Sequence, residues 1–234
     1  MFNRPHHQRI AHVLKALRAD MLQSHHCYFG GGTAIVMRFG EYRESLDVDF
    51  LVSDLAGYRK LREILTGLRG IKSLIRPEHE SLVAMQQIKA DQYGIRSRIH
   101  IVDQIIKFEI VHEGRIKLMT PGPGDKICGI TTLTPIDMAT SKLLANSDRF
   151  ADDSTFNRDI IDLAMINIPL AAYRKAVAKA ESAYGAAIKR DLKKCLMRMQ
   201  ERTGWLEQCI KVLAVHQTKA ELWQKIRSLN RLLR

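Results

Sequence analysis

The stretch CYFGGGTAIVMRFGEYRESLDVDFLV, residues 27–52, decides the fold of this chain. Its apolar start, residues 27–29, predicts a short strand that runs into three glycines at 30–32. Thr33 is a good N-cap, so residues 34–39 predict a short helix that ends at the turn around Gly40. The alternation in residues 47–52 predicts a second strand, with Asp47 and Asp49 on one face and apolar side chains on the other. A metal site on a sheet would use this arrangement.

Phosphoryl or nucleotidyl transfer needs a backbone cradle for a triphosphate and carboxylates that hold divalent ions against it. The glycines let backbone N–H groups approach phosphates, and the following helix points its positive N-terminus at them. Asp47 and Asp49 can bind two ions, Mg²⁺ or Mn²⁺, about 3.5–4 Å apart. Glu109, in the otherwise apolar strand 105–111, is the candidate third carboxylate, since such ions want near-octahedral oxygen coordination. A glycine turn or an Asp-x-Asp is common alone, whereas the ordered set is restrictive.

Periodicity outside this stretch predicts an α+β protein. A mixed sheet with flanking helices would form a domain over residues 1–124, and a helical bundle with a basic tail would form a second domain over 125–234. The boundary follows the breaker Pro-Gly-Pro-Gly at 121–124. The other predicted strands are 81–90, 95–102 and 105–111, the last two joined by a turn at 103–104. The other predicted helices are 5–23, 55–69, 135–147, 158–166, 169–182, 185–202 and 204–234, the last with a break near His216.

The charge of the chain favours a polyanionic partner. The formal net charge is +12 and the pI is about 9.7. Residues 170–234 hold 15 Lys and Arg against 5 Asp and Glu, so +10 of this charge lies in the helical tail. RNA, DNA and nucleotide phosphates are all candidate partners, and a solvated helical face is the alternative interpretation.

The cysteines and histidines do not predict a further metal site. The four cysteines lack the paired spacing of a zinc site and are expected to be reduced thiols. Adjacent histidines, His6–His7 and His25–His26, diverge on a helix or strand, so solvated or packing roles are favoured. No apolar run approaches the ~18 residues of a membrane span, so we expect a cytoplasmic protein without a membrane partner.

Two blocks of sequence resemble a known family. Gly31-Gly32-Thr33-Ala34, followed by Arg43, Ser45 and DVDF at 47–50, is similar to the first motif of the nucleotidyltransferase fold shared with DNA polymerase beta. LTPIDMATSKLLA at 133–145, with 148–149 and RDIIDL at 158–163, resembles the later helical motifs of the AbiEii/AbiGii-type toxins within that fold. The likeness covers about residues 26–166, and no motif covers the basic tail.

The resemblance implies a role for each matching residue. Asp47 and Asp49 would be metal ligands, with Glu109 as the third ligand and base toward the acceptor hydroxyl. Phosphate would be held by Gly31, Gly32 and Thr33, with help from Arg43 and Ser45. Lys142 would neutralise the triphosphate, and the floor of the active site would be organised by Arg158, Asp159 or Asp162, with the choice between the two aspartates left open. From the residues alone, Lys142 could equally be a solvated helix charge, and Asp162 could pair with Arg158 one turn away.

Two departures from the family pattern leave points open. Gly30 adds a third glycine, so the amides that touch phosphate are uncertain by one position. Residues 150–157 separate the two helical motifs and could form a mobile loop or a lid.

The resemblance implies a metal-dependent nucleotidyltransferase that moves a nucleoside monophosphate from a nucleoside triphosphate to RNA, such as tRNA, or to protein. It would be the toxin of a toxin–antitoxin or abortive-infection pair, with a cognate antitoxin. One alternative is a nucleotidyltransferase that modifies a small molecule such as an aminoglycoside, although a cationic drug would prefer an acidic cleft. The other is a non-catalytic nucleic-acid-binding protein. The sequence leaves the triphosphate and the oligomeric state open.

Overall fold

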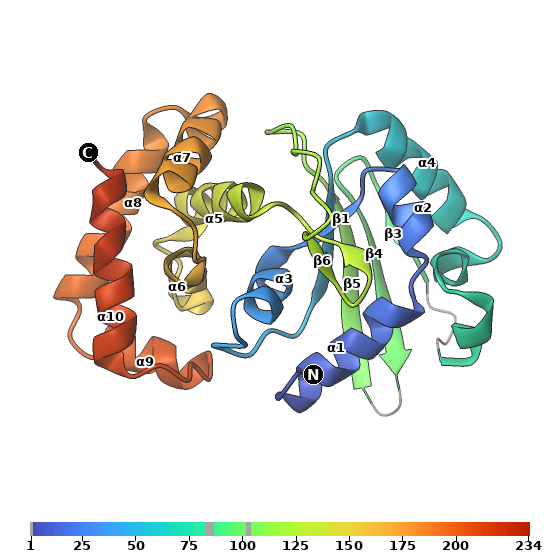
Figure 1. Cartoon of the computed structure of the whole chain (residues 1–234), viewed down its shortest axis with the longest axis horizontal. Helices are drawn as coiled ribbons and strands as arrows, with labels where there is room; N and C mark the ends of the chain where they lie inside the picture. The colour runs from blue at the N-terminus through green and yellow to red at the C-terminus, as the bar shows by residue number, and fades with distance from the viewer. Residues whose placement is uncertain (1, 83–86, 102–103) are drawn as a thin grey trace. The chain divides into compact units, whose positions relative to one another are not determined.

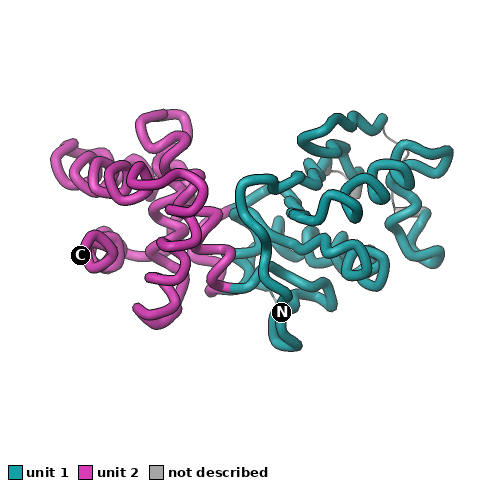
Figure 2. The backbone as a smooth tube through the Cα atoms, turned by 90° about the horizontal axis from the view of Figure 1, so that it is seen from above, with its two compact units in different colours: residues 1–38, 45–134 teal, residues 39–44, 135–234 magenta. Residues whose placement is uncertain are grey.

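The chain forms two compact units, each built from more than one segment. The computed structural model describes residues 2–82, 87–101 and 104–234. Unit 1 comprises Met1–Arg38 and Ser45–Thr134, and unit 2 comprises Phe39–Glu44 and Pro135–Arg234 (Figure 2). The stretch that decides the fold therefore serves both units, because its middle belongs to unit 2 and its ends belong to unit 1.

Unit 1 is organised around a mixed sheet. The strand order is β1-β2-β5-β4-β3, in which β2 and β5 are parallel and the other neighbours are antiparallel. A small hairpin of two further strands follows the sheet in the chain. Figure 1 shows the sheet with α1 and α4 lying alongside it. The strands are β1 Tyr28–Gly30, β2 Val48–Val52, β3 Lys89–Ala90, β4 Gly94–Ile101, β5 Gln104–His112, β6 Lys126–Ile127 and β7 Ile130–Thr131.

The two faces of the central strands differ in chemistry. Three phenylalanines from adjacent strands, Phe29, Phe50 and Phe108, are fully buried. The ring centroid of Phe50 lies 5.5 Å from that of Phe29 and 5.6 Å from that of Phe108. Because side chains alternate along a strand, the neighbours Asp49 and Glu109 lie on the opposite face. The apolar face supplies the core, and the other face is left for polar groups.

The helices of unit 1 partly match the sequence prediction. The helix expected over 5–23 is divided, because Leu17 is extended and forms a bridge with Ile75, while Arg18 N donates to Leu74 O at 2.8 Å. The strand expected over 81–90 is reduced among the described residues to Lys89–Ala90, and residues 83–86 lie outside them. The turn expected at 103–104 also falls partly outside. The helices are α1 Pro5–Ala16, α2 Ala19–Ser24, α3 Gly31–Arg38, α4 Leu55–Thr66, η1 Gly70–Leu74 and η2 Pro77–Leu82.

Unit 2 is a helical bundle that also takes in residues 39–44. Glu44 N donates to Leu213 O at 3.1 Å, and His216 N donates to Tyr42 O at 2.9 Å. The expected break near His216 separates α9 from α10, which begins with a capping box at Thr218. The helices are α5 Pro135–Arg149, η3 Asp153–Thr155, α6 Arg158–Met165, α7 Leu170–Tyr184, α8 Ala187–Glu201, α9 Trp205–Val212, α10 Lys219–Ser228 and η4 Leu229–Leu232. The predicted fold class, a mixed sheet with flanking helices and a helical bundle, is confirmed.

Residues 150–157 are packed into unit 2. Trp205 Nε1 donates to Asn157 Oδ1 at 2.7 Å, and the Phe156 ring stacks on Trp205 with centroids 5.9 Å apart. Arg198 and Arg202 both lie over the Trp205 ring, and both pair with Asp153. These contacts hold the segment against α8 and α9.

None of the described helices is both long enough and apolar enough to cross a bilayer.

The four cysteines are free thiols, and three of them are fully buried. Burial raises the pKa of Cys195 and Cys209 to about 12 and raises the pKa of Cys27 further. Cys128 is partly exposed, and burial raises its pKa as well.

At pH 8 we expect Ellman's reagent to label Cys128 alone, and slowly, because the thiolate is the reactive form. All four should react in guanidinium chloride. Labelling of more than one thiol in the folded protein, or persistence of labelling in Cys128→Ser, would contradict the packing described above.

Candidate active site

The glycine bend lies directly against Asp49. Gly31 opens α3 with φ +66°, and a Cβ built on it would come within 2.5 Å of Asp49 Oδ2. Only glycine tolerates both this conformation and this approach. The first-turn amides of α3 therefore begin beside the Asp49 carboxylate.

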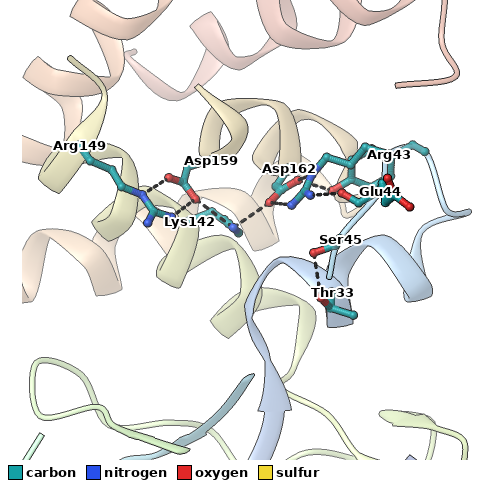
Figure 3. Close-up of polar contacts among 9 residues, drawn as sticks. Thr33, Arg43, Glu44, Ser45, Lys142, Arg149, Asp159 and Asp162 are labelled. Atoms are coloured by element: carbon teal, nitrogen blue, oxygen red, sulfur yellow. Dashed lines mark hydrogen bonds and ion pairs between the residues drawn. The ribbon is translucent and has the colours of Figure 1, made fainter. Parts of the chain in front are cut away.

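Thr33 lies inside α3 rather than capping it. The helix begins at Gly31, three residues earlier than expected, so the N-cap prediction was wrong. Thr33 is buried, and its hydroxyl is 2.8 Å from Ser45 Oγ (Figure 3). This contact ties α3 to the segment that leads into the acidic strand.

The parallel pairing of β2 and β5 brings the predicted carboxylates together. Asp49 stands opposite Glu109 in the register, so both side chains lie on the same face. Asp47 immediately precedes β2. Glu109 accepts from Arg96 Nε at 2.7 Å and pairs with Lys107 Nζ at 3.0 Å. The acidic face of the sheet thus carries its own counter-cations.

The pKa of Lys107 is affected by all three carboxylates. Burial lowers the pKa of Lys107, but the hydrogen bond and charge of Glu109, with the charges of Asp47 and Asp49, raise it more, so the pKa is raised overall. A single ammonium therefore feels the field of each acidic residue that the sequence singled out. The three carboxylates share one neighbourhood.

The side chains of Asp47, Asp49 and Glu109 are of the type that binds hard divalent cations. Carboxylate oxygens are the ligands that Mg²⁺ and Mn²⁺ prefer. Among residues 2–82, 87–101 and 104–234, no three His, Cys, Asp or Glu side chains are close enough to hold a metal ion in the present conformation. Both Glu109 oxygens face cations instead. The side chains of Arg96 and Lys107 are 42% and 53% exposed, so both can move into solvent and leave these oxygens to a metal.

A buried polar network joins four of the predicted residues within unit 2: Arg43, Lys142, Asp159 and Asp162. Asp162 accepts from Tyr42 Oη at 2.6 Å and from Arg43 Nε and Nη2 at 2.6 and 2.7 Å. Lys142 Nζ lies 2.7 Å from Asp162 and 2.9 Å from Asp159 (Figure 3). Arg149 Nε donates to the other oxygen of Asp159 at 2.6 Å.

Electrostatics keeps these two carboxylates ionised. Burial raises the pKa of Asp159, but the charges and hydrogen bonds of Lys142 and Arg149 lower it more, so its pKa is well below the usual range. The pKa of Asp162 is also lowered, because Arg43 and Lys142 outweigh its burial. The network holds three cations against two carboxylates.

Two interpretations of single residues change with this network. Lys142 is 6% exposed, so it is not a solvated helix charge. Among the described residues, the partners of the Asp162 carboxylate are Tyr42, Arg43 and Lys142, and Arg158 is not one of them. The predicted roles of Lys142, Asp159, Asp162 and Arg158 in catalysis remain predictions.

Four residues of these clusters were given no site role from the sequence: Arg96, Lys107, Tyr42 and Arg149. Lys107 stands two residues before Glu109 on the same strand face, and this spacing could have identified it. Arg96 pairs with Glu109 only through the β4–β5 register, whereas Tyr42 and Arg149 require the tertiary fold.

Comparisons with known proteins point to one family. A sequence profile described as "Nucleotidyl transferase AbiEii toxin, Type IV TA system" matches residues 12–225. The fold is similar to the crystal structure of JHP933 from Helicobacter pylori, with a TM-score of 0.57, 16% identity, and coverage of 99% of this chain and 93% of that one. It is also similar to MenT4, a nucleotidyltransferase toxin from Mycobacterium tuberculosis, with a TM-score of 0.51, 15% identity, and coverage of 97% and 82%. No curated protein matches the sequence.

The approach of Gly31 to Asp49 can be tested by Gly31→Ala. We expect the left-handed conformation to cost about 1–2 kcal/mol of unfolding free energy, with a further loss from displacing Asp49. Gly129→Ala is the matched control, because Gly129 has φ +84° but no atom within 4 Å of the added methyl group. Urea unfolding of both variants measures the difference. Equal losses would show that the contact with Asp49 contributes nothing.

The buried network can be tested by Asp162→Asn. Removing this charge leaves Arg43 and Lys142 buried with less compensation, so we expect a loss of about 3–5 kcal/mol in unfolding free energy at pH 7. Both carboxylates have folded-state pKa values below the unfolded value of about 3.9. Their stabilisation is therefore fully present above that pH and falls as pH drops through the folded-state values. Urea unfolding between pH 7 and pH 3 should show acid destabilisation that is weaker in Asp162→Asn. An unchanged acid profile would contradict the assignment.

Proposed function

The chain belongs to the AbiEii family of nucleotidyl transferase toxins of type IV toxin–antitoxin systems, and we propose that it transfers a nucleoside monophosphate from a nucleoside triphosphate to a hydroxyl group of an acceptor. The observation that carries this proposal is the register of β2 and β5. It sets Asp49 beside Glu109, on the side of the sheet where Gly31 meets Asp49.

Asp47, Asp49 and Glu109 would hold Mg²⁺ or Mn²⁺, and the ion would neutralise charge on the phosphates and on the attacking and leaving oxygens. Glu109 would also accept the proton of the acceptor hydroxyl. The acceptor oxygen then forms a bond to the α-phosphorus, the bond between that phosphorus and the β-phosphate oxygen breaks, and pyrophosphate leaves. Arg96 and Lys107, which now pair with the two oxygens of Glu109, would have to move away from them before the metal ion or the acceptor binds.

The phosphate-binding groups follow from α3 and the buried network. The first-turn amides at Gly31, Gly32 and Thr33 lack helical partners and would donate to the triphosphate, supported by Ser45 through its contact with Thr33. Lys142 would supply positive charge to the triphosphate. Arg43, Asp159 and Asp162, which belong to the same network, would set its position. Arg158, at the start of α6, would assist from outside the network.

The family implies an antitoxin partner for this chain. As acceptor we propose RNA, such as tRNA, with protein as the second candidate. The net charge of +12 favours an anionic acceptor over a cationic aminoglycoside. A triphosphate substrate and four free thiols suit a cytoplasmic location.

Replacing Asp47 or Asp49 with Asn tests the site directly. We expect each variant to lose at least about a hundredfold of magnesium-dependent incorporation from labelled triphosphates, since a metal ligand supplies several kcal/mol of charge stabilisation. Asp20→Asn is the control, because Asp20 is an exposed carboxylate whose side chain is 77% accessible. Total RNA, protein and aminoglycosides offered with each labelled triphosphate identify the acceptor. Incorporation that persists in Asp49→Asn, or without divalent metal, would refute the proposed function.

A further inference from the structure

A large cavity in unit 1 lies next to the acidic face of the sheet. It has a volume of about 840 Å³, within the range of sites that bind small molecules or short segments of polymer. Helix α4, the β3–β4 turn and the end of β5 form its walls. Its charged lining residues are Arg59, Arg62, Arg96, Arg115 and Glu113.

The charge of this cavity is positive and partly uncompensated. Arg115 is paired in a bidentate arrangement with Glu113, and Arg96 is paired with Asp91 and Glu109. Within the described part of the chain, no carboxylate forms an ion pair with Arg59 or Arg62. These two exposed arginines are one helical turn apart on α4, where like charges destabilise a helix slightly. Arg62 Nη1 donates to the backbone oxygen of Asp91 at 3.5 Å, so this guanidinium has a neutral partner but no carboxylate partner. Both guanidinium groups can therefore bind an anion, and guanidinium suits phosphate through paired N–H donors.

An exposed aromatic ring stands at the rim of the same cavity. Tyr93 is 66% exposed, yet its backbone is fixed. Tyr93 N donates to Asp91 Oδ1 at 2.7 Å, and Tyr93 O accepts from His112 N at 2.9 Å. A solvent-facing ring on a hydrogen-bonded turn, beside arginines that have no carboxylate partner among the described residues, is typical of surfaces that stack the bases of single-stranded nucleic acids.

Arg96 connects the cavity to the candidate catalytic carboxylate. Its side chain lines the cavity while its Nε donates to Glu109 at 2.7 Å. A smaller hollow of about 410 Å³ shares Arg96 and is lined further by Lys89, Arg98 and Lys107. Basic residues thus follow the β4–β5 face on both sides of Glu109.

Part of the net charge of +10 on residues 170–234 is neutralised by carboxylates outside the tail. Arg198 and Arg202, which are prominent in it, pair with Asp153 and cover the Trp205 ring. Their guanidinium groups are used in packing. By contrast, the charges of Arg59 and Arg62 face a cavity that reaches Glu109.

We propose that this cavity is the acceptor subsite, and that it binds the single-stranded end of an RNA acceptor. Arg59 and Arg62 would bind its phosphates, and Tyr93 would stack on one of its bases. The inference rests on the proposed function, because it places the acceptor hydroxyl next to Glu109. It assigns acceptor binding to unit 1 rather than to the basic tail of unit 2.

Binding of RNA can be measured separately from transfer. We would follow the fluorescence anisotropy of a short, labelled single-stranded RNA with the full chain in EDTA, where metal-dependent transfer is blocked. The double variant Arg59→Ala/Arg62→Ala should weaken binding at least about tenfold and flatten the dependence of log K on log[salt] by about 1.4 for two lost phosphate contacts. Tyr93→Ala should weaken it about tenfold, and Tyr93→Phe should retain it, because stacking needs only the ring.

The double variant Arg174→Ala/Lys175→Ala is the matched control, since it removes two exposed charges from α7 in the tail. It should change single-strand binding less than about twofold. In transfer assays, the Arg59/Arg62 double variant should raise the KM for RNA and leave the KM for triphosphate unchanged. Circular dichroism and thermal melts verify that each variant is folded.

Several results would overturn the inference. One is a larger loss of binding in the Arg174/Lys175 variant than in the Arg59/Arg62 variant. Another is equal binding of duplex RNA of the same length. A third is labelling of a protein acceptor alone, at the wild-type rate, by the Arg59/Arg62 variant. If Asp49→Asn abolishes transfer while the Arg59/Arg62 variant keeps both binding and transfer, only the acceptor subsite fails. If Asp49→Asn keeps transfer, the proposed function fails, and the binding data still decide whether the cavity holds RNA.

Discussion

The register between β2 and β5 is the constraint on which the site of unit 1 depends. The apolar face of these strands buries Phe50 and Phe108, each worth about 1.5–3 kcal/mol of stabilisation. A slip by one residue would turn these rings to the polar face and move Glu109 into the core, where a carboxylate without a partner is far more costly. Hydrophobic burial on one face therefore fixes which carboxylates meet on the other. The pairing of Asp49 with Glu109 is secured by residues that never touch a substrate.

Burial of charge plays the corresponding role in unit 2. Buried ion pairs add little net stability compared with apolar packing, but each member makes the loss of its partner costly. Arg43 belongs to this network although it lies in the sequence between α3 and β2. Its ion pair with Asp162 binds residues 39–44 to the helical bundle. The chain enters unit 2 at Phe39 and leaves it at Ser45, whose hydroxyl contacts Thr33. A polar contact thus fixes the end at which the chain returns to unit 1.

Local patterns predicted the parts of the fold that local physics decides. The strand, glycine bend, helix and acidic strand of residues 27–52 follow from periodicity and backbone freedom, and Glu109 could be named because it interrupts an apolar strand. Tertiary contacts decided the rest. The first helix ends at Ala16 because Leu17 pairs with Ile75, which no local signal announces. The Asp162–Arg158 alternative failed because Arg43, distant in sequence, offers a bidentate partner in a buried setting. Arg96 meets Glu109 only through a register that the sequence does not specify.

Cationic side chains without a carboxylate partner, rather than the total charge, indicate where an anionic acceptor binds. The tail of unit 2 dominates the net charge, and a sequence count therefore places a polyanion there. The structure distinguishes guanidinium groups that pair with a carboxylate from those that do not. A group already paired with a carboxylate attracts phosphate weakly. Arg59 and Arg62 keep their charge, and they face a concave surface, where low-dielectric walls strengthen the field. Because Arg96 belongs both to that surface and to the partners of Glu109, a phosphate chain bound there lies one side chain away from the candidate base. The smaller cluster of charge is thus the one that belongs to the same unit as the candidate base.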